Sequence, residues 1–225
     1  MPHTLLIPLV GPMQAWGSRS RFDDRDTHPE PTKSGVLGLI CAALGRPRWE
    51  PLADLNALRF GVRADAPGRA ATDFHTAQNV AKAGGGPTST VTSRRHYLAD
   101  ARFLCGLEGA DLALLHAIEA ALKNPVWPLS LGRNSFPLTC PPYLQDGSVR
   151  QDMDLEKAFA SVKWLAHPRP WDERPARLRL VLEEPDGEVV QSDVPEDYAA
   201  RRFGLRRLRV TTTPRPVEEE PHVPV

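Results

Sequence analysis

The chemistry-bearing residues nearest the start of the chain surround a predicted helix N-terminus. Pro31–Gly35 brings together hydroxyl groups, including that of Ser34, the ammonium group of Lys33 and unpaired backbone N–H groups. A helix N-terminus attracts anions, because its amides lack intrahelical partners and its dipole is positive there. Gln14 and Trp16 lie in a glycine-bounded loop that is expected to face this end. These residues alone leave two interpretations open, a phosphate-binding seat and an ordinary capped helix.

Two later segments carry donors that suit RNA. Arg133–Ser135 follows a glycine and offers guanidinium, amide and hydroxyl groups to phosphates or base edges. Arg94–Tyr97 interleaves basic residues with an aromatic ring, which suits a strand that lies along RNA and contacts its bases. The alternatives are a structural turn for the first segment and a solvated hairpin for the second.

Metal-independent RNA cleavage is the main enzymatic alternative. It needs a His or Tyr base and a cation that steadies the phosphate, and His75, His96, Tyr97 and Lys82 supply these types. The seven histidines are scattered, however, and the three cysteines form no CxxC pair. The sequence therefore predicts no metal site and no cofactor, and we assign no catalytic residue.

An arginine-rich run near the C-terminus is a further basic segment. It comprises Arg201, Arg202, Arg206, Arg207 and Arg209. This run could face RNA or an acidic partner. A solvated face is the alternative, because Asp193, Glu196 and Asp197 are close enough in the sequence to neutralise it.

The elements expected to position these residues form an α+β fold. Apolar periodicity predicts strands at 4–10, 59–65 and 101–107 and helices at 33–44 and 111–123. Their order indicates a ferredoxin-like split βαβ unit, the frame of RRM-like domains. Polar strands at 71–80 and 91–98 flank three glycines and predict a long β-hairpin arm, within an insertion at 66–100.

The C-terminal part is expected to be a less regular β region. It contains a predicted short helix at 154–162, a strand at 178–182 and a strand at 205–213 with Leu208 and Val210 facing inward. Residues 1–213 are therefore predicted to form one domain that carries the arm. A disordered tail is expected at 214–225.

The charge balance limits the nucleic-acid surface that this chain can carry. Its 225 residues include 28 basic and 28 acidic side chains, so the formal net charge is zero. Free-standing nucleic-acid binders usually carry a basic excess, because phosphate contacts supply most of the affinity. Any such surface here is therefore local or shared with partner subunits. No signal peptide or membrane span is recognised, and a cytoplasmic location is expected.

Five segments, in their order and spacing, carry a family resemblance. They are GPMQAWG (Gly11–Gly17), PTKSGVLGL (Pro31–Leu39), DFHTA (Asp73–Ala77), RHYLADARF (Arg95–Phe103) and LGRNSFPLT (Leu131–Thr139). Together they resemble the CasD family, a Cascade subunit family of type I-E CRISPR systems in the RAMP superfamily. The resemblance spans roughly residues 4–165, and its most specific part is GPMQAWG followed by P-T-[KR]-S-G.

The resemblance implies a ferredoxin-like, RRM-like RAMP palm with the arm as its β-hairpin thumb. It also implies a non-catalytic subunit that binds the 5′ handle of the CRISPR RNA (crRNA) and caps the backbone of CasC subunits. Such a subunit contacts the large subunit CasA and meets target DNA in the assembled complex. Type I-C relatives cut precursor RNA with a Tyr, Lys and His arrangement, and the Lys-His pair expected of them is missing here.

The expected RNA-binding face combines all of these segments. Its residues are Gln14, Trp16, Lys33, Ser34, Arg94, Arg95, His96, Tyr97, Arg133, Asn134 and Ser135. Two other functions stay open at this point. One is a metal-independent endoribonuclease that processes precursor CRISPR RNA, and the other is a subunit that only bridges proteins.

Overall fold

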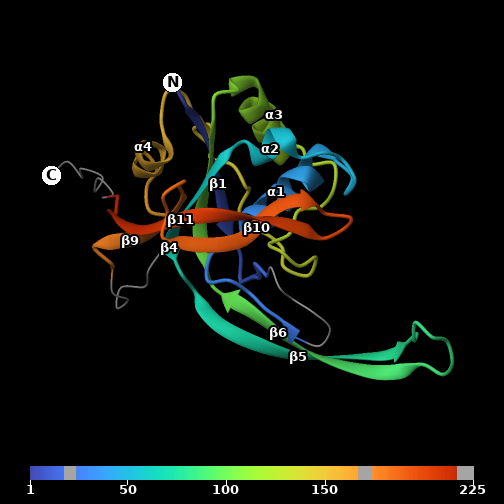
Figure 1. Cartoon of the computed structure of the whole chain (residues 1–225). Coiled ribbons are helices and arrows are strands. Elements are labelled where there is room, and N and C mark those ends of the chain that lie inside the picture. Colours follow the sequence, from blue (N-terminus) through green and yellow to red (C-terminus); the bar gives the residue numbers. More distant parts are fainter. Residues whose placement is uncertain (18–23, 167–173, 217–225) are drawn as a thin grey trace.

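The structure is a computed structural model that describes residues 1–17, 24–166 and 174–216 (Figure 1). It is an α+β fold with a large antiparallel sheet, four helices in the described ranges, and a long two-stranded arm that leaves the body. No helix in these ranges is long and apolar enough to cross a membrane.

The large sheet has seven strands, which all pair antiparallel. They are β1 (His3–Val10), β4 (Arg59–Ala66), β7 (Arg102–Gly109), β8 (Val149–Arg150), β9 (Arg177–Glu183), β10 (Val189–Asp197) and β11 (Arg202–Pro214). Their order across the sheet is β10-β11-β9-β4-β7-β1-β8. The helices are α1 (Lys33–Leu44), α2 (Ala53–Asn56), α3 (Leu112–Lys123) and α4 (Leu155–Ala160).

The sheet separates two apolar clusters. Leu5 and Ile7 of β1 belong to the cluster that contains α1 and α3, whereas Leu6 belongs to the cluster that contains α4. Both faces of β1 are thus covered, which explains why this strand is apolar from Leu5 to Val10. On the α4 side, a Cβ atom at Gly106 would lie 2.5 Å from Leu155 Cδ2, so the glycine lets the helix pack closely.

The ends of α1 and α3 agree with the predicted helices. The Thr32 hydroxyl accepts a hydrogen bond from the Gly35 N–H at 3.2 Å, and Gly45 ends α1 with a φ of 73°. The Asp111 carboxylate accepts from the Leu114 N–H at 3.0 Å and begins α3. Side-chain caps and a left-handed glycine are local signals, which is why the sequence located these helices well.

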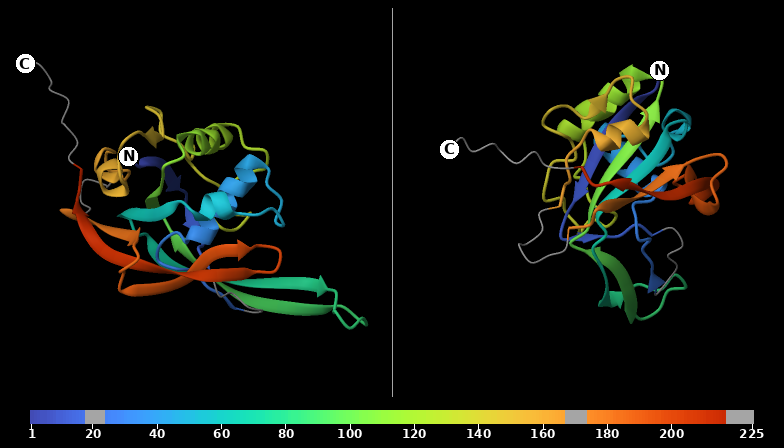
Figure 2. Two further views of the ribbon diagram at one scale, coloured as in Figure 1. Left: turned by 45° about the horizontal axis from the view of Figure 1, so that its top comes forward. Right: turned by 90° about the vertical axis from the view of Figure 1, so that its left-hand side faces the viewer.

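The arm is a twisted hairpin of β5 (Arg69–Val80) and β6 (Ser89–Ala99), and it projects from the body in both views of Figure 2. The two predicted polar strands are confirmed. Their pairing runs from Arg69 opposite Ala99 to Val80 opposite Ser89. At the base, β2 (Met13–Gln14) and β3 (Asp24–Arg25) also pair with β6, so the arm starts as a four-stranded sheet.

The C-terminal region is more regular than expected, because β9, β10 and β11 extend the large sheet. Leu208 is buried as predicted, but the inward orientation predicted for Val210 is wrong, since this side chain is exposed. The segment expected to be a disordered tail begins inside β11, and the Arg215 N–H still donates to the Ala176 carbonyl at 3.0 Å. Residues 217–225, and residues 18–23 of the charged loop, lie outside the described residues.

Candidate functional site

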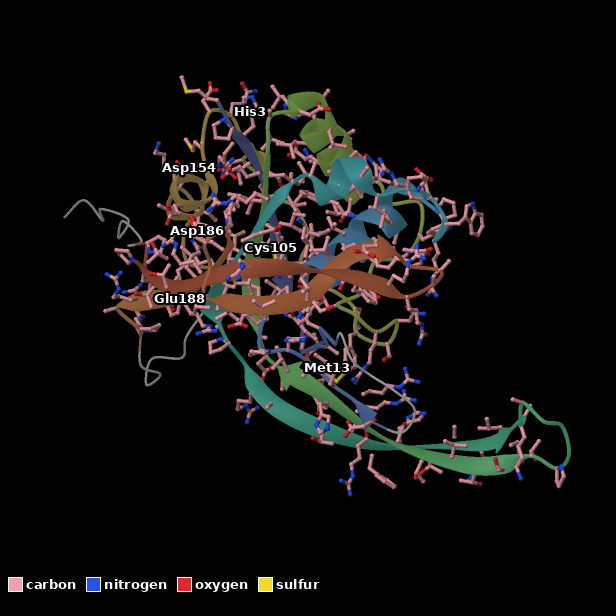
Figure 3. The ribbon with its side chains drawn as sticks, in the orientation of Figure 1. His3, Met13, Cys105, Asp154, Asp186 and Glu188 are labelled. Atoms are coloured by element: carbon pink, nitrogen blue, oxygen red, sulfur yellow. The ribbon has the colours of Figure 1, made fainter. Side chains whose placement is uncertain are left out.

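The two loop motifs, Gly11–Gly17 and Leu131–Thr139, pack against each other at the base of the arm. The Ala15 N–H donates to the Leu131 carbonyl at 3.0 Å. Gly132 has a φ of 90°, and a Cβ atom there would lie 1.7 Å from the Ala15 carbonyl oxygen. Glycine is therefore required at this contact, and the contact fixes where the next residue, Arg133, is presented. Figure 3 shows Met13, from the first loop, at the root of the arm.

Gln14 and Trp16 are structural, which corrects their predicted role as RNA contacts. The Gln14 amide donates to the carbonyls of Leu9 (3.1 Å) and Ala101 (2.8 Å) and accepts from Trp16 Nε1 at 3.1 Å. Trp16 is only 1% exposed. Its ring lies against α1 at Gly35, where an added Cβ would come within 2.8 Å of a ring carbon. The polar atoms of Gln14 are thus saturated inside the protein, and the indole has no open face for a base.

Lys33 does not form the predicted phosphate seat. Its side chain is 1% exposed, and its ammonium group donates to the carbonyls of Asn56 and Leu58 and to the carboxylate of Glu183. Burial lowers the pKa of Lys33, and the Glu183 charge opposes that shift. Ser34 is also buried, with its carbonyl bound by the Tyr198 hydroxyl. Both residues therefore tie α1 to neighbouring segments of the fold instead of facing RNA.

The anion at the N-terminus of α1 comes from the chain itself. The Lys33 N–H donates to Asp193 Oδ2 at 2.8 Å, and the same carboxylate pairs with Arg206 through bonds of 2.6 and 2.8 Å. The prediction that this helix end attracts an anion agrees with the structure, since amides and dipole favour negative charge there. The anion is not a phosphate but the Asp193 carboxylate on β10, which lies 160 residues further along the chain.

Three arginines gather beside the arm base and form the candidate site, which we name the arginine cluster: Arg25, Arg95 and Arg133. Arg25 of β3 pairs in register with Arg95 of β6. Arg133 reaches over from the loop, donating to the carbonyls of Arg25 (3.3 Å) and His96 (2.7 Å). Its guanidinium also lies 5.3 Å from the ring centre of Phe136. One loop and two strands thus bring together guanidinium groups that are far apart in the sequence.

The charges of the arginine cluster are not balanced by ion pairs within the described part of the chain. No salt bridge there joins any of the three guanidinium groups to a carboxylate, although Asp73 and Asp26 lie near enough to affect Arg133. Burial lowers the pKa of Arg133, and repulsion from Arg95 and Arg25 lowers it further. Positive charges held close together in this way are stabilised when an anion binds between them. A phosphate diester has the negative charge and the hydrogen-bond acceptors to do so.

The remaining predicted residues divide between the two faces of the arm and the adjoining loop. Asn134 and Ser135 are exposed beside Arg133. Tyr97 packs on Phe136, with ring centres 5.9 Å apart, and is partly buried against the hydrophobic core. His96 lies on the other face of β6, where Nε2 is 3.1 Å from Asp24 and Nδ1 is 2.9 Å from the Thr72 hydroxyl.

The C-terminal arginines are mostly engaged by acidic residues. Arg206 pairs with Asp193, Arg202 with Asp197, and Arg209 with both Glu184 and Glu156. Within the described residues Arg201 and Arg207 form no salt bridge, so this run keeps two unpaired charges, against three in the arginine cluster. In the described ranges, no three His, Cys, Asp or Glu side chains are grouped to hold a metal ion.

Sequence reasoning missed Arg25 as a member of the site. The residue stands in a charged loop with no periodic pattern, and only its pairing with β6 brings it beside Arg95. Phe136 lies within the LGRNSFPLT segment, but no local signal marks it as the ring that supports Arg133 and Tyr97. The alternation of side chains along a predicted strand could have separated Arg95 from its neighbours, because adjacent residues face opposite sides.

Comparison with known proteins identifies the class. A family model described as CRISPR-associated protein (Cas_Cas5) matches residues 4–209, so the chain belongs to this family. It is 35% identical over 175 residues to the "CRISPR system Cascade subunit CasD" of Escherichia coli (strain K12), covering 71% of this chain and 76% of the relative.

Two solved structures resemble the whole fold. One, described as "Crystal structure of Cas protein", has a TM-score of 0.74 and 43% identity, covering 96% of this chain and 100% of the other. The second, described as "CRISPR RNA-guided surveillance complex", has a TM-score of 0.79 and 33% identity, covering 95% of this chain and 91% of the other. Coverage of this extent takes in most of the large sheet, its helices and the arm.

Proposed function

We propose that this protein is a non-catalytic subunit of a type I-E CRISPR surveillance complex (Cascade) that binds the 5′ handle of crRNA in antiviral defence. The observation that carries the proposal is the arginine cluster, three guanidinium groups without ion-pair partners among the described residues, at the root of an extended arm. Membership of the Cas5 family and similarity to a Cascade subunit and a surveillance-complex structure support it.

We infer that the palm is ferredoxin-like. The chain order β1-α1-β4-β7-α3-β8 and the sheet order β4-β7-β1-β8 correspond to a βαββαβ unit whose strands are all antiparallel. In RRM-like domains such a sheet supports single-stranded RNA recognition. In this chain β9, β10 and β11 continue the sheet, and we expect RNA at the arm base instead of over the sheet face.

The local character of the arginine cluster fits the formal net charge of zero. A chain that held RNA alone would need many phosphate contacts and a basic excess. A few arginines suffice if neighbouring subunits hold the rest of the same RNA. We therefore place Arg94, Arg95, Arg133, Asn134 and Ser135 in the handle contact, with phosphates bound by the arginines and base edges by the amide and hydroxyl groups.

Exposed apolar side chains support protein partners as well. Trp49 is 80% exposed and lies beyond the end of α1, and Trp127 is also exposed. Leu205 is 71% exposed on β11. Tryptophan is enriched at protein–protein interfaces relative to the rest of the surface. We propose CasC backbone subunits and the large subunit CasA as these partners, with target DNA meeting the assembled complex and the whole complex in the cytoplasm.

The alternative function is metal-independent cleavage of precursor CRISPR RNA, and the geometry of His96 argues against it. Its two ring nitrogens are engaged by Asp24 and Thr72, and Tyr97 is packed against Phe136. A general base needs a free nitrogen within hydrogen-bond reach of the attacking hydroxyl. Two of the three side chains that would supply a base are thus engaged in structural contacts, whereas the third, His75, is exposed on β5.

The test follows RNA retention and RNA cleavage together. The full chain is mixed with CasC-type subunits and cognate precursor CRISPR RNA, without metal, on native and denaturing gels. We expect intact RNA and a handle-dependent shift. Arg95→Ala should weaken the shift and lower the slope of log K against log salt by about 0.7, the value for one lost single-strand phosphate contact. Arg48→Ala removes an exposed arginine outside the arm and should leave the slope unchanged.

Two results would contradict the proposal. Specific cleavage that His96→Ala abolishes would make the protein a processing nuclease. Equal salt slopes for the wild type and Arg95→Ala would mean that the arginine cluster does not contact phosphate. Arg133→Lys keeps the charge but loses the forked donors, so its slope should stay at the wild-type value while its affinity falls, which separates bidentate contact from general attraction.

A further inference from the structure

The tryptophan and tyrosine rings that suggest base stacking in the sequence are engaged by the fold, whereas another ring is exposed. Trp16 is buried, and Tyr97 packs on Phe136. Phe74 on β5, by contrast, is 65% exposed. It belongs to the DFHTA segment, yet nothing in its local sequence pattern marks it as a binding residue.

Strand register places Phe74 among polar and basic groups. It lies directly opposite Arg94, and the next pair on the same face is Thr72 with His96. The opposite face carries Asp73 paired with Arg95, the latter being part of the arginine cluster. The two faces of the arm are therefore chemically different, one with clustered guanidinium groups and one with an exposed ring beside Arg94.

The exposure of Phe74 is not explained by packing of the arm. Of the side chains on β5 and β6, only Leu98 is buried, so the hairpin has no apolar layer beneath the ring. A cross-strand contact with Arg94 stabilises the hairpin only slightly, far less than burial of the ring would. An exposed aromatic ring beside basic side chains is the combination on which the bases of single-stranded nucleic acid stack.

We propose that Phe74, with Arg94 beside it, forms a stacking site for one unpaired nucleobase. The inference rests on the proposed RNA-binding function and adds a site to it. Arg94 and Arg95 are adjacent on β6 and point to opposite faces, so an RNA strand that crosses the edge of the arm would contact the arginine cluster on one face and the ring on the other. Arg94 assists by attracting the phosphate of the stacked nucleotide and by contact with the base.

If Phe74 stacks on a base, RNA retention should depend on the aromatic ring and not on the apolar character of the side chain. Phe74→Leu keeps a large apolar side chain but has no π face, whereas Phe74→Tyr keeps the face. Val91→Thr is the matched control, because Val91 is an exposed apolar residue of the same arm, opposite Ala77 on the other face. Limited proteolysis at the Gly84–Gly86 tip reports whether each variant retains the hairpin.

The experiment uses the full chain with CasC-type subunits and cognate guide RNA in which 2-aminopurine replaces one base at a time. We expect Phe74→Leu to weaken retention about 5-fold to 150-fold, the range for loss of one base–aromatic stack. It should also raise 2-aminopurine fluorescence at a single position, while Phe74→Tyr and Val91→Thr behave as the wild type.

The outcomes separate this inference from the proposed function. If Phe74→Leu matches the wild type while Arg95→Ala loses RNA, the stacking site is refuted and the RNA-binding function stands. The stacking site is likewise refuted if the leucine and tyrosine variants lose RNA equally with their tip cleavage unchanged. If the wild-type chain retains no RNA in any arrangement, both the function and the stacking site are refuted.

Discussion

Replacement of Asp193 by asparagine should strongly destabilise the protein, because this carboxylate is the buried junction between α1 and the C-terminal strands. It is fully buried and accepts hydrogen bonds from the Lys33 N–H, from Gln191 and twice from Arg206. The Arg206 side chain is itself only 4% exposed, and its guanidinium lies 5.1 Å from the ring centre of Phe60. Removal of the negative charge leaves a buried cation and a helix N-terminus without their anion.

The expected cost follows from that burial. Loss of one partner from a buried, hydrogen-bonded ion pair costs about 3 to 5 kcal/mol, because the other charge remains desolvated. A domain of this kind has a total free energy of unfolding of about 5 to 15 kcal/mol. Asparagine keeps the shape and one acceptor, so we expect a loss of about 3 kcal/mol, the lower end of that range. The double variant Asp193→Leu with Arg206→Met removes both charges and should recover much of the loss.

The measurement is urea denaturation of the purified chain, with Asp197→Asn as the matched control. Asp197 is on the same strand and pairs with Arg202 at 3.3 Å, but its side chain is 31% exposed and that of Arg202 is 66% exposed. A surface pair of this kind is worth about 0 to 1 kcal/mol. If the two asparagine variants lose equal stability, or if the double variant is worse than Asp193→Asn, the buried junction does not stabilise the protein as inferred.

Two further predictions concern the loop contact and the acid limb of stability. Gly132→Ala should destabilise the protein and weaken RNA retention, because its Cβ collides with the Ala15 carbonyl. Gly147→Ala, with a φ of 93° and open space around it, should show only backbone strain in the same urea denaturation assay. Burial raises the pKa of Glu119, but hydrogen bonds from the Ser148 N–H and Lys123 lower it more, to below 4.5. The contribution of Glu119 to the free energy of unfolding is therefore present above pH 4.5 and is lost as the pH falls through its lower pKa in the folded protein. Glu119→Gln should accordingly make the urea midpoint fall less steeply as the pH is lowered. An unchanged pH dependence of the midpoint would contradict this.

The part of the fold that sequence could predict is the part specified by neighbouring residues. Thr32 and Gly45 bound α1 as expected, because capping and left-handed turns depend on a few adjacent residues. The arm is predictable from its polar, strand-forming stretches and glycine tip. Strand β10 was missed, because Pro195 and two irregularities in its register break the alternation that marks a strand.

The candidate site was predicted less well, since exposure depends on contacts across the chain. Lys33, Gln14 and Trp16 have the side chains of a binding site, and only the positions of Glu183, Ala101 and Gly35 show that they are satisfied internally. A family motif can thus be a scaffold. Here GPMQAWG and PTKSG pack together at the N-terminal end of α1, and GPMQAWG also holds the Leu131–Thr139 loop. That loop in turn presents Arg133.

The distribution of contacts along the arm supports a division of labour between its base and its tip. An isolated two-stranded hairpin is marginally stable in water. At the base, β2 and β3 widen β6 into a larger sheet and Arg133 fastens two strands through their carbonyls, so the arginine cluster is held in a fixed geometry. Beyond Ala77 the register is irregular, and a side chain added at any of the three tip glycines would meet no other atom within 4 Å. Ordered donors at the base suit one defined RNA backbone path, whereas an unsupported tip can adjust to whichever base or strand it meets. This gradient predicts that substitutions at the tip change RNA retention much less than those in the arginine cluster.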